Sequence, residues 1–152
     1  EMSNIDANEK AAFFQDVEAA AKRAIWCALG TVTGNEPRVR MVHPTWEGDT
    51  LWIATGPETY KAKEIQANSA VDLQFQVAPD DFVHLLVRGK ATVLTDEATK
   101  VRIWDVMDYD LAQFWPGGAT SPDFCVIRVD PTRVELSHMF GTMNKRVWKA
   151  DA

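Results

Sequence analysis

The sequence has only two cysteines, Cys27 and Cys125, and they lie far apart in the chain. They form no CxxC pair, and their spacing is not typical of a metal site. We therefore expect two reduced thiols that act as small core residues. Reduced thiols are typical of a reducing compartment, and the sequence predicts a cytoplasmic location.

Long hydrophobic runs and an excess of basic residues are also missing. The longest apolar run, Ala24–Leu29, is far shorter than the roughly 20 residues that span a bilayer. The N-terminus is polar and acidic, unlike a signal peptide. The 16 Lys and Arg residues against 22 Asp and Glu give a formal net charge of −6. Nucleic acids and anionic membranes both require a basic surface, so we expect neither as a partner and expect a small-molecule substrate instead.

The common catalytic and nucleotide-binding motifs are absent as well. The sequence contains no GxGxxG, Walker, GxSxG or HExxH motif. His43, His84 and His138 are too scattered to form a local metal motif. We therefore predict no metal site, and the sequence identifies no catalytic residue.

What the sequence does contain is typical of one globular domain. It has 152 residues, of which 46% are hydrophobic and 25% are charged. It shows no repeat and no linker. We expect a single domain over residues 1–152, with a core over about 24–140, an N-terminal helix at 7–24 and a C-terminal tail at 141–152.

Local patterns predict a mainly β protein. Asp6 and Glu9 have the spacing of a capping box at the start of the first helix. Turn residues separate short β-prone segments, and Gly89 predicts a bulge or a close approach of another backbone segment. The expected strands are 25–32, 38–44, 51–55, 71–77, 82–94, 124–129 and 133–140, with turns at 79–81 and 130–132. The other expected helices are 58–68 and 95–109, the second with Ala98, Val101 and Trp104 facing inward.

The helices do not alternate regularly with the strands, and this pattern argues against a doubly wound parallel sheet. The pattern favours six or seven antiparallel strands in a barrel or sandwich with flanking helices.

One stretch of the chain is less acidic than the rest and predicts an anion site. Residues 38–63 carry a net charge of +1, whereas the remainder carries −7. Lys61 and the hydroxyl of Thr59 fall at the start of a predicted helix, where free N–H groups favour an anion. Lys61 and Lys63 point roughly 200° apart on such a helix, so only one of them can face the anion. From charge alone, solvated surface cations remain an alternative interpretation.

Five segments follow one another in an order that narrows the function. They are Val39-Arg-Met-Val42, Leu51-Trp-Ile-Ala-Thr55, Thr59-Tyr-Lys-Ala-Lys-Glu-Ile-Gln-Ala-Asn68, Val83-His-Leu-Leu-Val-Arg-Gly-Lys-Ala91 and the loop from Phe114 to Asp123. In this order they resemble the FMN-binding split barrels of the pyridoxamine 5′-phosphate oxidase-like superfamily, and the loop resembles its general stress protein 26 branch. The resemblance covers about residues 24–138 and implies an antiparallel split barrel that binds FMN.

The resemblance also implies which residues touch the cofactor. Arg40 would meet the phosphate or the ribityl chain of FMN. Met41 and Val42 would offer main-chain groups to the flavin ring, and Ala54 and Thr55 would line it from the next strand.

Four further positions complete this implied site. Thr59 and Lys61 would hold the phosphate, and His84 falls where the oxidase has a glutamine that contacts the cofactor. Trp115 is a candidate for the flat apolar slot that the ring needs. Tyr60 replaces the second phosphate cation of the family, so Arg38 or Lys63 would have to contribute.

The chain departs from the true oxidase at its substrate site. The lysine that binds the phosphate of the vitamin would fall at Thr45, and no Arg-x-His-x-Arg motif occurs before Ala152. We therefore expect an FMN-dependent oxidoreductase of unknown substrate that does not oxidise pyridoxamine phosphate. The alternative is a non-catalytic stress protein that binds flavin, deazaflavin F420 or haem, with one of the histidines ligating the haem iron.

Relatives of this kind pair so that each flavin touches both chains. The resemblance therefore implies a homodimer with the cofactor at the subunit interface. The loop residues Phe114 and Trp115 and the tail residues Arg146 and Trp148 are candidates for reaching across.

Overall fold

The computed structural model describes residues 3–75 and 82–151. The helices are α1 (Lys10–Ala24), α2 (Tyr60–Ala67) and α3 (Glu97–Val106), with a 3₁₀ turn at Leu111–Gln113. The strands are β1 (Cys27–Thr33), β2 (Glu36–Val42), β3 (Thr45–Glu47), β4 (Thr50–Thr55), β5 (Ala70–Phe75), β6 (Val83–Leu94), β7 (Cys125–His138) and β8 (Met143–Lys149). Within the described ranges, no helix combines the length and the apolar character needed to cross a bilayer.

All eight strands belong to one antiparallel sheet, with the order β2-β1-β5-β6-β7-β4-β3 and β8 paired with β7. The two ends of this order, β2 and β3, are joined in the chain by only His43 and Pro44. The sheet therefore curls back toward itself without closing. The predicted mainly β split barrel is confirmed, with eight strands instead of six or seven.

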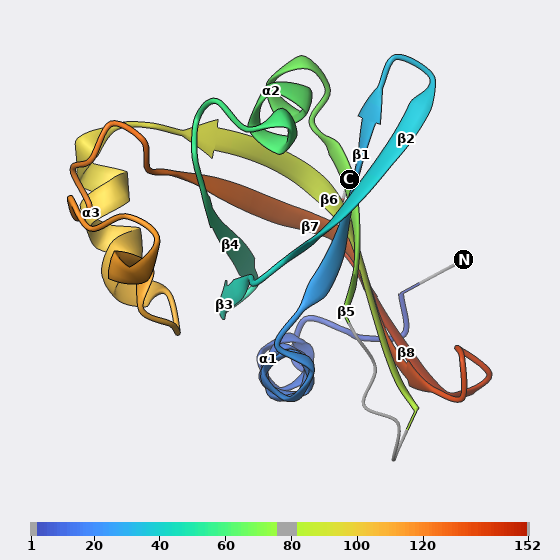
Figure 1. Ribbon diagram of the computed structural model, residues 1–152. Coiled ribbons are helices and arrows are strands. Elements are labelled where there is room, and N and C mark those ends of the chain that lie inside the picture. The colour runs from blue at the N-terminus through green and yellow to red at the C-terminus, as the bar shows by residue number, and fades with distance from the viewer. Residues whose placement is uncertain (1–2, 76–81, 152) are drawn as a thin grey trace.

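The three helices flank the curled sheet (Figure 1). Figure 1 shows α1 and α2 at opposite ends of the sheet, and α3 beside the end of β6 and the start of β7. The larger core lies between the sheet and α1 and includes Phe13, Leu29, Phe75 and Val134. A smaller core beneath α3 includes Trp52, Ile103 and Phe124.

The predicted capping box forms. The side chain of Asp6 accepts a hydrogen bond from the N–H of Glu9 at 3.0 Å, and the Glu9 carboxylate accepts one from the N–H of Asp6 at 3.1 Å. The regular helix begins at Lys10, three residues later than expected, because residues 7–9 form the turn that this box closes.

The predicted turn at 130–132 is wrong, because β7 runs without a break through these residues. The register between β6 and β7 shifts between Arg88 and Gly89, and Gly89 lies opposite Pro131. A proline cannot donate to a strand ladder, and a bulge accommodates it. The predicted bulge at Gly89 is thus confirmed, and it is the feature that keeps β7 continuous.

The segment expected as a tail is mostly strand β8, which pairs with the second half of β7. Trp148 is only 9% exposed and packs edge-on against Phe14 of α1, with ring centroids 5.1 Å apart. Arg146 forms an ion pair with Asp16 at 2.8 Å. The expectation that Trp148 reaches a second chain is therefore wrong, since this side chain completes the core of its own chain.

The inward face expected for the third helix is correct for Trp104, which packs against Phe124, but wrong for Ala98 and Val101. Ile103 and Lys100 are buried, whereas Val101 is 44% exposed and Ala98 is exposed. The smaller core accepts a different face of the helix because Lys100 donates to the carbonyl of Ser121 at 2.8 Å and fixes the rotation of the helix. The expected turn at 79–81 and the end of the expected strand 71–77 lie outside the described residues.

Candidate functional site

Three of the predicted cofactor residues, Thr55, Thr59 and Lys61, gather at the N-terminus of α2. Thr59 is the N-cap residue, and its hydroxyl accepts from the N–H of Ala62 and donates to the carbonyl of Gly56 at 2.8 Å. Its oxygen lies 3.1 Å from the hydroxyl of Thr55 at the end of β4. Lys61 donates to the same Thr55 hydroxyl at 3.2 Å. Two hydroxyls and an ammonium group therefore converge where the helix dipole favours an anion.

Lys61 lies in this cluster without a carboxylate partner among the described residues. Its side chain is half-buried, and burial lowers its pKa below 10.5. The positive charge of Arg40 lowers the pKa further, and Cys125 partly offsets this. A bound anion would raise the pKa of Lys61 again, because it would supply the negative charge that the cluster lacks.

Arg40 lies close to this cluster but already has partners. Its guanidinium donates to the carbonyl of Leu29 at 3.1 Å, to the hydroxyl of Thr31 at 2.8 Å and to the carboxylate of Glu64 at 2.5 Å. Arg40 therefore ties β2 to β1 and α2.

Glu64 is the acidic member of this link. Burial raises its pKa, but hydrogen bonds from Thr33 and Thr31 and the charge of Arg40 outweigh burial. The net result is a pKa below the ordinary 4.5.

We expect Glu64→Gln to destabilise the protein by about 1–3 kcal/mol at neutral pH, since the pair with Arg40 loses its charge. Because the pKa of Glu64 is lower in the folded state, its ionised carboxylate stabilises the fold at pH values above the unfolded-state pKa. This stabilisation is lost as the pH falls through the folded-state pKa. The difference in unfolding free energy between the wild type and Glu64→Gln should therefore become smaller at acidic pH. Urea unfolding at several pH values measures it. Glu58→Gln, at an exposed carboxylate, should show little deficit, and an equal deficit for both would contradict this account.

The strand residues of the predicted site lie on either side of this cluster. Met41 is 55% exposed and Val42 is buried near the end of β2, and Ala54 is half-buried beside Thr55. In the strand order, β2 pairs only with β1, so one edge of its backbone faces no strand among those described.

His84 and Trp115 are not brought into this cluster. His84 lies 3.6 Å from Glu135 on β7. Trp115 donates to the carbonyl of Asp123 at 2.8 Å and packs against Phe124. Asp123 lines a pocket together with Gly56 and Thr59, so its carbonyl links Trp115 to the neighbourhood of the cluster.

Two cations could replace the second phosphate cation that Tyr60 does not supply. Both form ion pairs on the surface. Arg38 pairs with Glu36 at 2.7 Å, and Lys63 pairs with Glu58 at 3.3 Å. The expectation that only one of Lys61 and Lys63 faces the anion site agrees with this arrangement.

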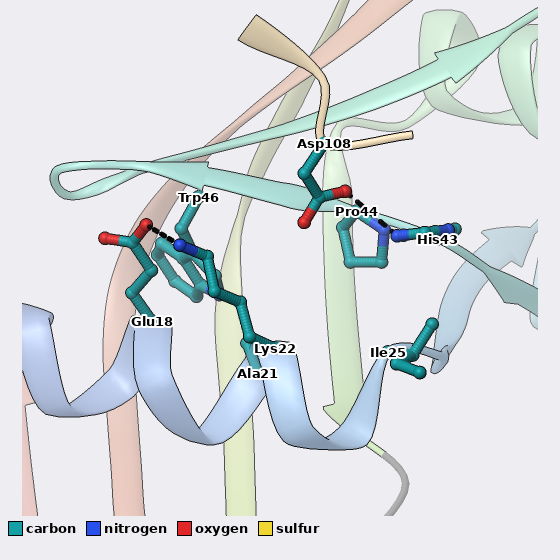
Figure 2. A pocket seen from close by; sticks show the side chains of 8 residues that line it. All are labelled: Glu18, Ala21, Lys22, Ile25, His43, Pro44, Trp46 and Asp108. Atoms are coloured by element: carbon teal, nitrogen blue, oxygen red, sulfur yellow. Dashed lines mark ion pairs between the residues drawn. The ribbon is translucent and has the colours of Figure 1, made fainter. Parts of the chain in front are cut away.

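The sequence analysis did not predict that His43 and Asp108 would lie together. His43 and Asp108 lie far apart in the sequence, yet their side chains pair at 3.0 Å beside a pocket (Figure 2). No local spacing links them, and only the corner between β2 and β3 brings them together. Within the described ranges, no three His, Cys, Asp or Glu side chains gather as a metal site.

Comparison with known proteins identifies the family. The family described as Pyridoxamine 5′-phosphate oxidase matches residues 13–138 of the chain. The chain belongs to this family. Within it, the chain is 26% identical to General stress protein 26 of Bacillus subtilis (strain 168) over 111 residues, which is 72% of this chain and 76% of the relative.

Solved structures of the family share the fold. A protein related to general stress protein 26 from Clostridium acetobutylicum has a TM-score of 0.75 and 19% identity, covering 93% of this chain and 96% of that one. An FMN-binding protein related to pyridoxamine 5′-phosphate oxidase from Nostoc punctiforme has a TM-score of 0.66 and 16% identity, covering 93% and 96%. An F420 reductase has a TM-score of 0.58 and 25% identity, covering 76% and 92%.

Proposed function

We propose that this family member binds FMN, with the phosphate at Lys61, and acts as an FMN-dependent oxidoreductase on a small molecule. The observation that carries the proposal is the half-buried Lys61, which donates to the Thr55 hydroxyl and has no carboxylate partner among the described residues. This arrangement fits a phosphate, because the ammonium group and the start of α2 both favour negative charge.

FMN would supply the redox chemistry, and the protein would bind and orient it. Lys61 and Thr59 would hold the phosphate end, and the free edge of β2 would face the ring. Thr45 supports a substrate other than pyridoxamine phosphate. Its hydroxyl is hydrogen-bonded to the carboxylate of Asp108 at 3.0 Å, an arrangement that repels a second anion.

Deazaflavin F420 is the second candidate cofactor, and the F420 reductase neighbour favours it. The experiment is a titration of the purified, cofactor-stripped protein with FMN and, separately, with F420, followed by absorption and fluorescence. We expect FMN to bind and NAD(P)H then to be consumed when a suitable acceptor is added. Binding of F420 alone would replace the cofactor assignment, and binding of FMN without any turnover would favour a storage or sensing protein.

We also propose a homodimer, which the outer face of the β2 side of the sheet supports. Val39 is 72% exposed and Met41 is 55% exposed on β2. An adjoining groove of about 640 Å³ is lined by Gly30, Val39 and Val71 among others. A contiguous apolar face of this kind is typical of an interaction surface.

Val39→Asp should weaken dimerisation by at least about tenfold, because it places an unpaired charge in the proposed interface. Sedimentation velocity over a range of protein concentrations measures this. Val101→Asp, at an exposed valine of α3, is the matched control and should not change association. A wild-type protein that stays monomeric at high concentration would contradict the dimer.

The proposed cytoplasmic location has support from the two thiols. Cys27 and Cys125 are both free and buried. Burial raises the pKa of Cys27 to about 12 and that of Cys125 to about 11. Such thiols stay protonated and unreactive, as core residues do.

A further inference from the structure

Lys100 of α3 is a buried cation that the function proposed above does not use. The residue is only 7% exposed. Its ammonium group donates to the carbonyl of Ser121 at 2.8 Å and lies 5.8 Å from the centre of the Phe124 ring. No carboxylate pairs with it among residues 3–75 and 82–151. Lysine is almost never buried without an anionic partner, so we expect an anion to bind close to this side chain.

Lys100 and Lys61 both lie near the start of β7. Cys125, the first residue of this strand, lies opposite Thr55 of β4, whose hydroxyl accepts from Lys61 at 3.2 Å. Phe124, whose ring lies below the ammonium group of Lys100, directly precedes Cys125. Figure 1 shows α3 beside this end of β7. Two different helices therefore bring their ammonium groups to one short segment of the chain.

The charges of both lysines reach the thiol of Cys125. Burial raises the pKa of Cys125 to about 11, and the positive charges of Lys100 and Lys61 partly offset this rise. Coulomb interactions are screened less in a protein interior than in water, so a buried charge acts over a longer range than an exposed one. An anion at the start of α2 should therefore be attracted by both lysines.

The loop that Lys100 holds also borders the start of α2. Asp123 lines a pocket of about 490 Å³ together with Gly56 and Thr59. A Cβ on Gly56 would lie 3.1 Å from the carbonyl oxygen of Asp123, so the two backbone segments are in close contact. The hydrogen bond from Lys100 to Ser121 therefore fixes the lysine behind one wall of this pocket.

The carboxylates of this region are more exposed to solvent than Lys100. Asp123 is exposed and accepts from the hydroxyl of Ser121. Glu58 is exposed and pairs with Lys63 at 3.3 Å. Water and salt screen such exposed charges, whereas Lys100 is buried. The anion site therefore keeps most of the positive charge of the two lysines.

We propose that Lys100 is the second positive charge of the anion site and makes the site select a doubly charged phosphate monoester over a singly charged phosphodiester. This inference rests on the phosphate site proposed at Lys61 and adds the charge state that the site selects. A monoester such as FMN has a second phosphate pKa of about 6, so it carries roughly two negative charges at pH 8, whereas a diester carries one. The Coulomb energy is proportional to the ligand charge, so Lys100 stabilises the monoester more. The phosphate of F420 is a diester, and Lys100 thus favours FMN over F420.

Lys100→Gln tests the charge, because glutamine can still donate to the carbonyl of Ser121 but is neutral. At pH 8, FMN affinity should fall by about fivefold to tenfold. The methyl ester of FMN has one phosphate charge, and its affinity should fall by about twofold to threefold. Riboflavin has no phosphate and should bind as it does to the wild type. Fluorescence titration of the cofactor-stripped protein measures all three affinities.

Two further variants separate the charge of Lys100 from its hydrogen bond. Lys100→Met removes both, so its FMN affinity should match that of Lys100→Gln if the charge is what matters. Arg102→Gln removes a cation from the same helix, but Arg102 is exposed and pairs with Glu47 at 2.9 Å. This control should change FMN affinity by less than about twofold. Calorimetry shows whether each variant is folded.

Three results would overturn the proposal. The first is unchanged FMN affinity in Lys100→Gln. The second is an equal loss for FMN, its methyl ester and riboflavin, which would mean that the lysine supports the fold and not the phosphate. The third is a loss of FMN affinity in Lys100→Met alone, which would assign the effect to the hydrogen bond with Ser121.

The function proposed above fails by a different result, which is that FMN does not bind the wild-type protein. Inorganic phosphate at pH 8, followed by ³¹P NMR line broadening, then tests the two-lysine site without a flavin. Broadening that Lys100→Gln reduces would support the site. Broadening that Lys100→Gln leaves unchanged, or no broadening in the wild type, would overturn it.

Discussion

Lys61→Ala should weaken FMN binding by about 10–100-fold. A charge-assisted hydrogen bond of this kind contributes roughly 1.5–3 kcal/mol, and each 1.4 kcal/mol is a factor of about ten in affinity. The loss should be specific for the phosphate, because Lys61 donates only to the Thr55 hydroxyl among the described residues. Fluorescence titration with FMN and with riboflavin, which lacks the phosphate, measures the effect. Riboflavin affinity should be nearly unchanged.

Lys63→Ala is the matched control. Lys63 is two residues away on the same helix, but it is exposed and pairs with Glu58. Its removal should change FMN affinity by less than about twofold, as for other exposed ion pairs. Equal losses of FMN and riboflavin in Lys61→Ala would show that the lysine acts elsewhere on the ligand or on the fold.

The pH dependence of FMN affinity provides a second readout. The pKa of Lys61 is lowered in the free protein, so the lysine loses its proton at a lower pH than an exposed lysine does. A neutral amine cannot pair with the phosphate, and FMN affinity should therefore fall as the pH rises through this lowered pKa. Lys61→Arg should bind FMN without this decline, because a guanidinium stays charged.

Gly89→Ala should destabilise the protein by about 2–3 kcal/mol, which lowers the melting temperature by roughly 4–12 °C in a chain of this size. A Cβ on Gly89 would lie 2.6 Å from the carbonyl oxygen of Asp130 and 3.1 Å from the Cα of Pro131. Both are backbone atoms of β7, so neither can move aside without disturbing the longest strand pair of the sheet. Calorimetry and urea unfolding measure the loss.

Gly117→Ala is the control for the glycine substitution. A Cβ there would meet only the side chain of Ser121, at 3.3 Å, in an exposed turn. A side chain can shift, so this variant should lose less than about 0.5 kcal/mol, as is usual at the surface. If both alanine variants were equally stable, the close approach of β6 and β7 at the bulge would not constrain the fold as we describe.

The sequence predicted most of the elements because their signals are local. The capping box at Asp6 and the bulge at Gly89 each depend on one or two residue types with a specific backbone role. The order of strand and helix motifs was also enough to predict the split barrel and the family. These are features that the chain carries before it folds.

The errors arose where a local signal competed with a distant partner. Pro131 by itself predicts a turn, but Gly89 on the opposite strand leaves room for it within β7. The pattern of residues 141–152 predicts a tail, but the segment pairs with the free edge of β7 and its Trp148 packs against Phe14. In each case, long-range packing outweighed the local preference.

The sequence by itself determined which residue types are available for an anion site, because a cation and a hydroxyl at a helix start act through the local backbone. Only the tertiary structure decided that Lys61 has no carboxylate partner in residues 3–75 and 82–151, whereas Arg40 pairs with Glu64. It alone brought His43 to Asp108, since the corner after β2 meets the segment after α3 only in the folded chain. Helix starts are encoded locally, whereas burial and pairing between distant residues exist only once the sheet has curled around its core.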